Sequence, residues 1–370
     1  MYVEEINAKG GVLGRKLELV IRDSKADANE AVRVARELIL KENVDFLVGT
    51  LTSAEGPAVS VVAKENKIVF IAPIPKTDQL TAADKLHPYV FRVAANTTME
   101  GRSAAEIVAK WPVTKIATIA FDYAYGQDVT KAFVEHIKKL KPSVEIVDQQ
   151  WPKLGEQDYN PFINAQMAKK PEAIVSSIWG GFFVTYSKQA KALGVFDAVK
   201  YNFIGLGEAG SPETTKSMGA DYPVGIWGNS YDAFYWDESS PAHREYTARI
   251  SKFLKDEYPS SWAVQGYIGM QFLVEAIKKA NSVEADKVSK ALLGLQRGHA
   301  GGQADHPREG SSGQPRPALR QDGQGREVSL PDHEARDVRR SDQVHGLAST
   351  PLILAPSPCP LPWAGRGGKR

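Results

Sequence analysis

Short apolar segments alternate with longer amphipathic ones through the first 295 residues, and this alternation limits the possible folds more than any other feature. The segments "FLVG" (46–49) and "IVFIAP" (68–73) are apolar throughout. Parallel strands have this composition when helices cover both faces of their sheet. The intervening "GPAVSVVAKEN" (56–66) and the earlier "DANEAVRVARELILKEN" (27–43) have helical spacing instead. The sequence therefore predicts an α/β protein with doubly wound parallel sheets.

The composition changes abruptly after Leu295. Residues 296–370 contain no Phe, Tyr, Met or Asn, and ten Arg against one Lys, whereas residues 1–295 contain 27 Lys and 8 Arg. No apolar periodicity runs through this stretch. Shifting a back-translation of "EVSLPDHEARDVRR" (327–340) by one base gives KYPFPIMKPVTYV, a strand-like sequence. We interpret 296–370 as an out-of-frame, disordered tail, with a genuine disordered extension as the alternative, and assign no function to it.

Charge, cysteine content and motifs exclude several classes of protein. Residues 1–295 hold 35 basic and 36 acidic side chains, so no electrostatic footprint for nucleic acid is present. The single cysteine allows neither a disulfide framework nor a thiolate metal site. His87, His136 and His243 lack metal-ligand spacing, and no G-x-S-x-G nucleophile elbow is found. We expect no cofactor, no metal and no enzymatic activity.

Polar residues follow several of the predicted strands, where ligands bind in parallel sheets. Ser53 and the N–H groups of the helix start beside it suit a carboxylate, although a plain helix cap is the alternative. Lys76 and Thr77 would favour an anionic group, unless they form a solvated turn. Glu208 would pair with an ammonium group, or else lies on a surface loop.

Aromatic residues in the same loops form the second part of the predicted site. Tyr125, Trp179, Tyr231 and Phe234 offer flat apolar walls of the kind that line clefts for small ligands. Taken singly, most aromatic side chains belong to a core. Their shared location after strands favours a binding cleft.

Several of these stretches together resemble one family of transport proteins. They are "YVEEINAKGGVLGRKLELVIRDSKADANEAVRVARELI" (2–39), "FLVGTLTSAEGPAVSVVAKENKIVFIAPIPKTDQLT" (46–81), "IATIAFDYAYGQD" (116–128) and "FIGLGEAGS" (203–211). They resemble the branched-chain amino-acid (Leu/Ile/Val-type) solute-binding proteins of ABC importers, which have the type I periplasmic-binding-protein fold. The "INAKGGVLGRKLEL" segment (6–19) carries most of the specificity.

The resemblance implies two lobes that close over one small solute about a hinge, and a membrane permease as partner. Residues 1–118 plus 236–295 would form the first lobe and 119–235 the second, with 296–370 outside both. Members of this family carry an export signal and a first strand that are not found here, so we expect an N-terminally truncated chain whose first lobe is incomplete. The family is periplasmic and we expect a monomer; without a signal peptide the chain as given would stay in the cytoplasm.

By resemblance, Ser53 corresponds to the serine that binds a ligand carboxylate, Tyr125 and Trp179 to cleft residues of the second lobe, and Glu208 to the acid that meets an α-amino group. Lys76 departs from the family pattern, since it would repel an ammonium and attract a carboxylate. An amino acid, a dicarboxylate and an aromatic acid therefore all remain possible solutes. The alternative function is a cytosolic ligand-sensing regulator of the same fold, such as an amide sensor.

Overall fold

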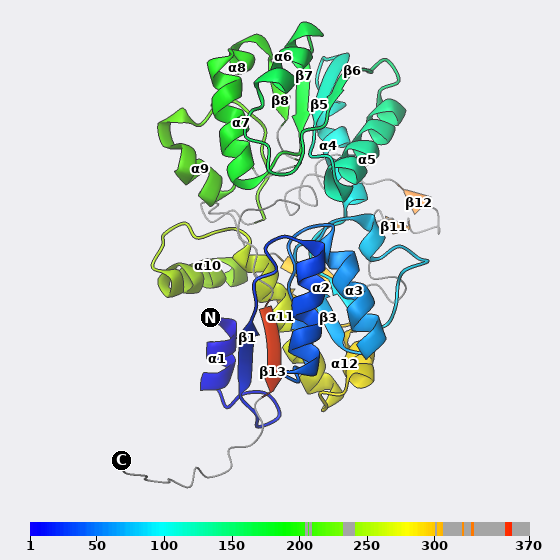
Figure 1. Ribbon diagram of the computed structural model, residues 1–370, viewed down its shortest axis with the longest axis vertical. Coiled ribbons are helices and arrows are strands. Elements are labelled where there is room, and N and C mark those ends of the chain that lie inside the picture. The colour runs from blue at the N-terminus through cyan, green and yellow to red at the C-terminus, as the bar shows by residue number, and fades with distance from the viewer. Residues whose placement is uncertain are drawn as a thin grey trace.

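The structure is a computed structural model that describes residues 1–203, 206, 209–231, 241–299, 302–305, 320–321, 327–328 and 352–356. It has two α/β lobes, each built around its own sheet, which are drawn one above the other in Figure 1. The predicted α/β class with parallel sheets is confirmed. The loops that carry Ser53, Lys76, Tyr125 and Trp179 lie where the two lobes meet.

The sheet of the first lobe has the strand order β1-β13-β2-β3-β4. Its strands are β1 (Leu17–Ile21), β13 (Leu352–Pro356), β2 (Phe46–Val48), β3 (Val69–Ala72) and β4 (Val90–Arg92). The last three pair in parallel. Alternate residues of β2 and β3 pack into different hydrophobic clusters, as expected for a sheet covered on both faces.

The strand β13 lies between β1 and β2 and is antiparallel to both. Figure 1 shows it beside β1. Its register pairs Leu354 with Leu19 and Ile353 with Leu47. The sequence predicts that the first strand of this sheet is missing. In the structure a strand from the C-terminal stretch, β13, is the second strand in the order of the sheet. The out-of-frame origin of 296–370 stays a prediction.

Helices cover both faces of the first sheet. One face carries α2 (Ala28–Leu40) and α3 (Glu55–Asn66), and the other carries α1 (Tyr2–Ala8), α10 (Pro241–Leu254), α11 (Ala263–Ala280) and α12 (Ala285–Leu292). The Asp27 carboxylate caps α2 by accepting from the Glu30 N–H at 2.8 Å. No helix in the described ranges is long and apolar enough to span a bilayer.

The second lobe contains a parallel sheet in the order β6-β5-β7-β8. Its strands are β5 (Lys115–Ile119), β6 (Glu145–Gln150), β7 (Ala173–Ser176) and β8 (Tyr201–Phe203). The helices around it are α4 (Thr97–Val108), α5 (Ala124–Leu140), α6 (Asn160–Ala168), α7 (Gly180–Ala192), α8 (Val195–Ala198) and α9 (Pro212–Met218). One hydrophobic cluster joins these elements, with Phe121, Phe133 and Phe183 fully buried in it.

The helix α4 packs with the second lobe, although the predicted limits assign it to the first. Ala104, Ala105 and Val108 belong to the hydrophobic cluster of the second lobe. A Cβ atom on Gly101 would lie only 2.6 Å from the carbonyl oxygen of Val129 on α5. The glycine thus allows α4 and α5 to come into backbone contact.

Short elements complete the described structure. They are the 3₁₀ helices η1 (Asp78–Leu80) and η2 (Gly219–Asp221), the strand pair β9 (Gln296–His299) and β10 (Gly302–Asp305), and the pair β11 (Arg320–Gln321) and β12 (Glu327–Val328).

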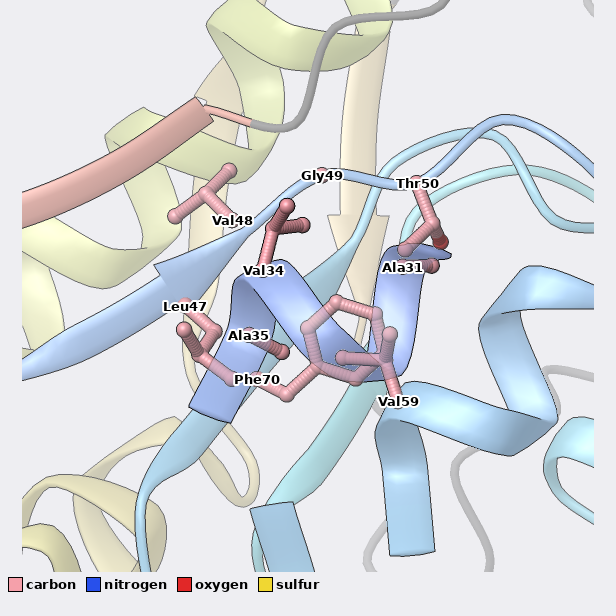
Figure 2. A pocket seen from close by; sticks show the side chains of 9 residues that line it. All are labelled: Ala31, Val34, Ala35, Leu47, Val48, Gly49, Thr50, Val59 and Phe70. Atoms are coloured by element: carbon pink, nitrogen blue, oxygen red, sulfur yellow. The ribbon is translucent and has the colours of Figure 1, made fainter. Parts of the chain in front are cut away.

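A small apolar void lies inside the first lobe, between α2, α3 and the sheet (Figure 2). Its volume is about 10 Å³. The residues around it are Ala31, Val34, Ala35, Leu47, Val48, Gly49, Thr50, Val59 and Phe70. The void is about the size of one water molecule and its lining is almost wholly apolar. It is therefore a packing gap in the core and no place for a solute.

Candidate ligand-binding site

A second cavity lies between the lobes and brings together several of the residues singled out in the sequence. Its volume is about 30 Å³. It is lined by Leu51, Thr52, Ser53, Ile74, Lys76, Tyr123, Tyr125, Trp179 and Trp262. Tyr123, Tyr125 and Trp179 come from the second lobe and the other residues from the first. Both lobes therefore supply side chains to one space.

The segment from Leu51 to Glu55 forms the start of α3 through a capping box. The Oγ1 of Thr52 accepts from the Glu55 N–H at 3.1 Å, and Glu55 Oε2 accepts from the N–H groups of Thr52 (2.7 Å) and Leu51 (3.2 Å). Two of the N–H groups expected to face a solute are thus already bonded. The N–H groups of Ser53 and Ala54 have no partner among the described residues. These two N–H groups are therefore the ones at this helix start that can donate to an anion.

Ser53 and Thr77 are linked directly, although only Ser53 lines the cavity. The Ser53 hydroxyl oxygen accepts from the Thr77 N–H at 3.1 Å. The Thr77 hydroxyl donates to Asp128 Oδ2 on α5 at 2.5 Å. Thr77 therefore joins the two lobes with its side chain and positions Ser53 with its backbone.

Lys76 lines the cavity and forms a buried ion pair. Its ammonium donates to Glu100 Oε1 on α4 at 2.7 Å, and the two residues are only 5% and 9% exposed. The ring centroids of Tyr125 and Tyr231 lie 5.7 and 5.1 Å from the Lys76 Nζ. Burial lowers the pKa of Lys76 and raises the pKa of Glu100, and their mutual attraction opposes both shifts.

Arg92, at the end of β4, holds the loop that carries Lys76. Its guanidinium donates to the carbonyl oxygens of Pro75 (3.1 Å), Lys76 (3.0 Å) and Thr77 (2.6 Å). Burial lowers the pKa of Arg92 to about 10, which leaves it charged at neutral pH. Sequence reasoning missed this residue, because an arginine in "FRVAAN" reads as part of an ordinary strand.

Aromatic side chains close the cavity from both sides. Trp179, at the start of α7, packs edge-on against Phe121, with ring centroids 6.1 Å apart. Tyr231 packs edge-on against Trp262, which precedes α11, at 6.2 Å. Burial raises the pKa of Tyr125 far above its usual value, so its hydroxyl stays neutral. Trp262 was not singled out in the sequence because it follows a loop and no strand.

The structure brings Ser53, Lys76, Tyr125 and Trp179 into one cavity and puts Tyr231 against Lys76. The predicted Glu208 and Phe234 lie outside the described residues. No group of three His, Cys, Asp or Glu side chains able to hold a metal occurs within the described part of the chain.

The helix α9 of the second lobe also contacts the loop that leads to Trp262. Glu213 accepts from the Ser261 N–H and the Ser260 hydroxyl, each at 3.4 Å. Lys216 donates to Asp256 Oδ1 at 2.5 Å. One wall of the cavity is therefore joined to the second lobe by a half-buried carboxylate.

We expect Glu213 to make the stability of the protein fall as pH rises. Burial raises the pKa of Glu213 from 4.5 to about 7, so the folded chain binds the proton more tightly than the unfolded chain. The unfolding free energy should decline between pH 4.5 and 7, by at most about 3 kcal/mol, and level off above. Urea unfolding of Glu213→Gln at pH 5 and pH 8 checks this.

Glu213→Gln should lose the decline in unfolding free energy between pH 4.5 and 7. Glu284→Gln, which changes an exposed carboxylate paired with Lys287, serves as the control and should retain the wild-type dependence. An unchanged pH profile in Glu213→Gln would show that this carboxylate has no such role.

Comparisons with known proteins agree with this architecture. A "Leucine-, isoleucine-, valine-, threonine-, and alanine-binding protein" from Pseudomonas aeruginosa is 26% identical over 299 residues, which cover 79% of this chain and 75% of the relative. Among solved structures, an ABC-transporter solute-binding protein from Rhodopseudomonas palustris HaA2 in complex with p-hydroxybenzoic acid superposes with a TM-score of 0.74 at 20% identity. It covers 83% of this chain and 82% of that chain.

A further solved structure is the branched-chain amino acid transporter substrate-binding protein of Streptococcus pneumoniae in complex with isoleucine. Its TM-score is 0.72 at 22% identity, with 82% of this chain and 84% of that chain covered. The family model described as "Periplasmic binding protein" matches residues 1–316. The resemblance to branched-chain amino-acid solute-binding proteins is thereby confirmed. With its two α/β lobes and a match over most of its length, the chain belongs to the periplasmic binding protein family.

Proposed function

We propose that this protein is the solute-binding component of an ABC importer, which holds a small carboxylate-bearing solute between its lobes and delivers it to a membrane permease. The observation that carries the proposal is the cavity with polar groups from the first lobe, Ser53 and Lys76, facing aromatic walls, Tyr125 and Trp179, from the second. We further propose that it acts in the periplasm as a monomer.

Closure of the lobes would provide the binding energy. A solute that touches both lobes stabilises the closed arrangement, because only there does it gain both sets of contacts. The cavity of about 30 Å³ is far smaller than sites for small organic ligands, which span roughly 300–1,000 Å³. The lobes must therefore separate to admit a solute, with the second lobe turning away from Ser53.

The hydroxyl and N–H of Ser53 would donate to the solute carboxylate, with the N–H of Ala54 beside them. The names of the relatives support two kinds of solute, amino acids such as isoleucine and aromatic acids such as p-hydroxybenzoic acid. Both kinds have a carboxylate and an apolar body, which match Ser53 on one side and Trp179 on the other.

We expect small carboxylates with an apolar body to raise the melting temperature and to bind in calorimetry. In Ser53→Ala, affinity for the best of them should fall about tenfold or more, because a hydrogen bond to a charged group contributes roughly 1.5–3 kcal/mol. Trp179→Ala should weaken binding similarly by removing a wall of the cavity.

The control for both variants is Ser103→Ala, an exposed position on α4 outside the cavity, which should bind like the wild type. If no amino acid, dicarboxylate or aromatic acid binds to the folded wild-type chain, the proposed function is wrong.

A further inference from the structure

The surroundings of the Lys76 ammonium form a complete recognition site for a cation. A carboxylate oxygen of Glu100 lies at 2.7 Å, and the rings of Tyr125 and Tyr231 lie within 6 Å. A carboxylate together with aromatic faces is the combination by which proteins bind ammonium groups. In this protein the Lys76 ammonium itself occupies the position between the Glu100 carboxylate and the two tyrosine rings.

A solute with its own ammonium group would compete with Lys76 for this position. Lys76 and Glu100 are almost fully buried and lie in different lobes, on the loop after β3 and on α4. Displacing Lys76 would leave a buried charge without its partner, which strongly disfavours binding of the competing ammonium. Placing a second cation beside it would add repulsion between like charges in a poorly hydrated space.

The described lining of the cavity also favours an anion. Among its described residues Lys76 has the one ammonium group, and Glu100, which pairs with it, is not part of this lining. Burial raises the pKa of the Tyr123 and Tyr125 hydroxyls, so these stay neutral. No carboxylate is among the lining residues that the structure describes. Ser53 adds a hydroxyl and an N–H that has no partner within the described part of the chain, and both groups suit an anion.

From this geometry we infer that Lys76 makes the site select apolar carboxylic acids without an α-amino group over the corresponding amino acids. The inference rests on the proposed function and names the class of solute. Ser53 meets the carboxylate, the aromatic walls cover the apolar body, and Lys76 takes the place of the amine.

The test compares pairs of solutes that differ only in the α-ammonium group. Titration calorimetry on the full chain at pH 7 uses 3-phenylpropionate against phenylalanine and 4-methylpentanoate against leucine. The deaminated acid of at least one pair should bind tenfold or more tightly than its amino acid. Equal or tighter binding of the amino acids, or binding of none of the four compounds, overturns this inference. The proposed function fails separately, when no amino acid, dicarboxylate or aromatic acid binds to the folded chain.

Substitutions at Lys76 and Glu100 test whether Lys76 causes the preference for acids without an α-amino group. The double substitution Lys76→Met with Glu100→Gln removes both charges, so no unpaired buried charge remains. Its preference for the deaminated acid should fall tenfold or more, while Lys76→Arg, which keeps the cation, should retain the preference. If the double variant melts cooperatively and keeps the wild-type ratio of affinities between deaminated acid and amino acid, Lys76 does not cause the preference. If the double variant does not fold, loss of the preference in Lys76→Arg leads to the same conclusion.

Discussion

Replacing Glu100 by Ala should lower the free energy of unfolding by about 3–5 kcal/mol, because the change leaves the Lys76 ammonium buried without the carboxylate that pairs with it. The two groups are 2.7 Å apart and almost fully buried. Burial also lowers the pKa of Lys76, so part of the loss will be relieved at high pH by deprotonation. Urea unfolding followed by tryptophan fluorescence measures the effect.

Two further variants test whether the loss of stability in Glu100→Ala comes from the buried charge of Lys76. Glu106 lies on the same helix and pairs with His136 at 3.1 Å, but its side chain is 42% exposed. Glu106→Ala should therefore cost less than about 1 kcal/mol. The double variant Lys76→Met with Glu100→Leu should recover most of the stability, because an apolar pair can replace a buried ion pair. A loss below 1 kcal/mol in Glu100→Ala would mean that Lys76 reaches water.

Substituting Gly101 by Ala should cost about 3 kcal/mol, since the added methyl group has no space. Its Cβ would lie 2.6 Å from the Val129 carbonyl oxygen, 2.7 Å from the Phe133 nitrogen and 2.8 Å from the Ala132 Cβ. Backbone atoms cannot rotate away, so α4 must move away from α5. Glu100 precedes Gly101, and we expect solute affinity to fall together with the melting temperature.

Gly266 on α11 provides the matched control. It is also a glycine inside a helix, but a Cβ there would meet nothing within 4 Å. Gly266→Ala should raise stability by about 0.5–1 kcal/mol, because alanine favours the helix. If Gly101→Ala were as stable as Gly266→Ala, the close contact between α4 and α5 would not exist in solution.

The chemistry of the site was partly visible in the loops that follow strands. Ser53 follows β2, Lys76 follows β3 and Trp179 follows β7, and the carboxyl ends of parallel strands meet at one edge of each sheet. Glu100 gave no such signal, because it lies inside a helix and helical glutamates are usually solvated. Trp262 directly precedes α11 of the first lobe. It lines the cavity because of the path that the chain takes back from the second lobe to the first, and no local pattern of residues indicates that path.

The sequence alone determined that the chain forms strands and helices in alternation, because short continuous apolar runs and a helical apolar period of 3.6 are local properties of neighbouring residues. Only the tertiary structure decided that α4 packs with the second lobe, that 352–356 lies between β1 and β2, and that Lys76 meets Glu100. These contacts join residues far apart in the chain. Their energies depend on burial and distance in three dimensions, which no local pattern of residues records.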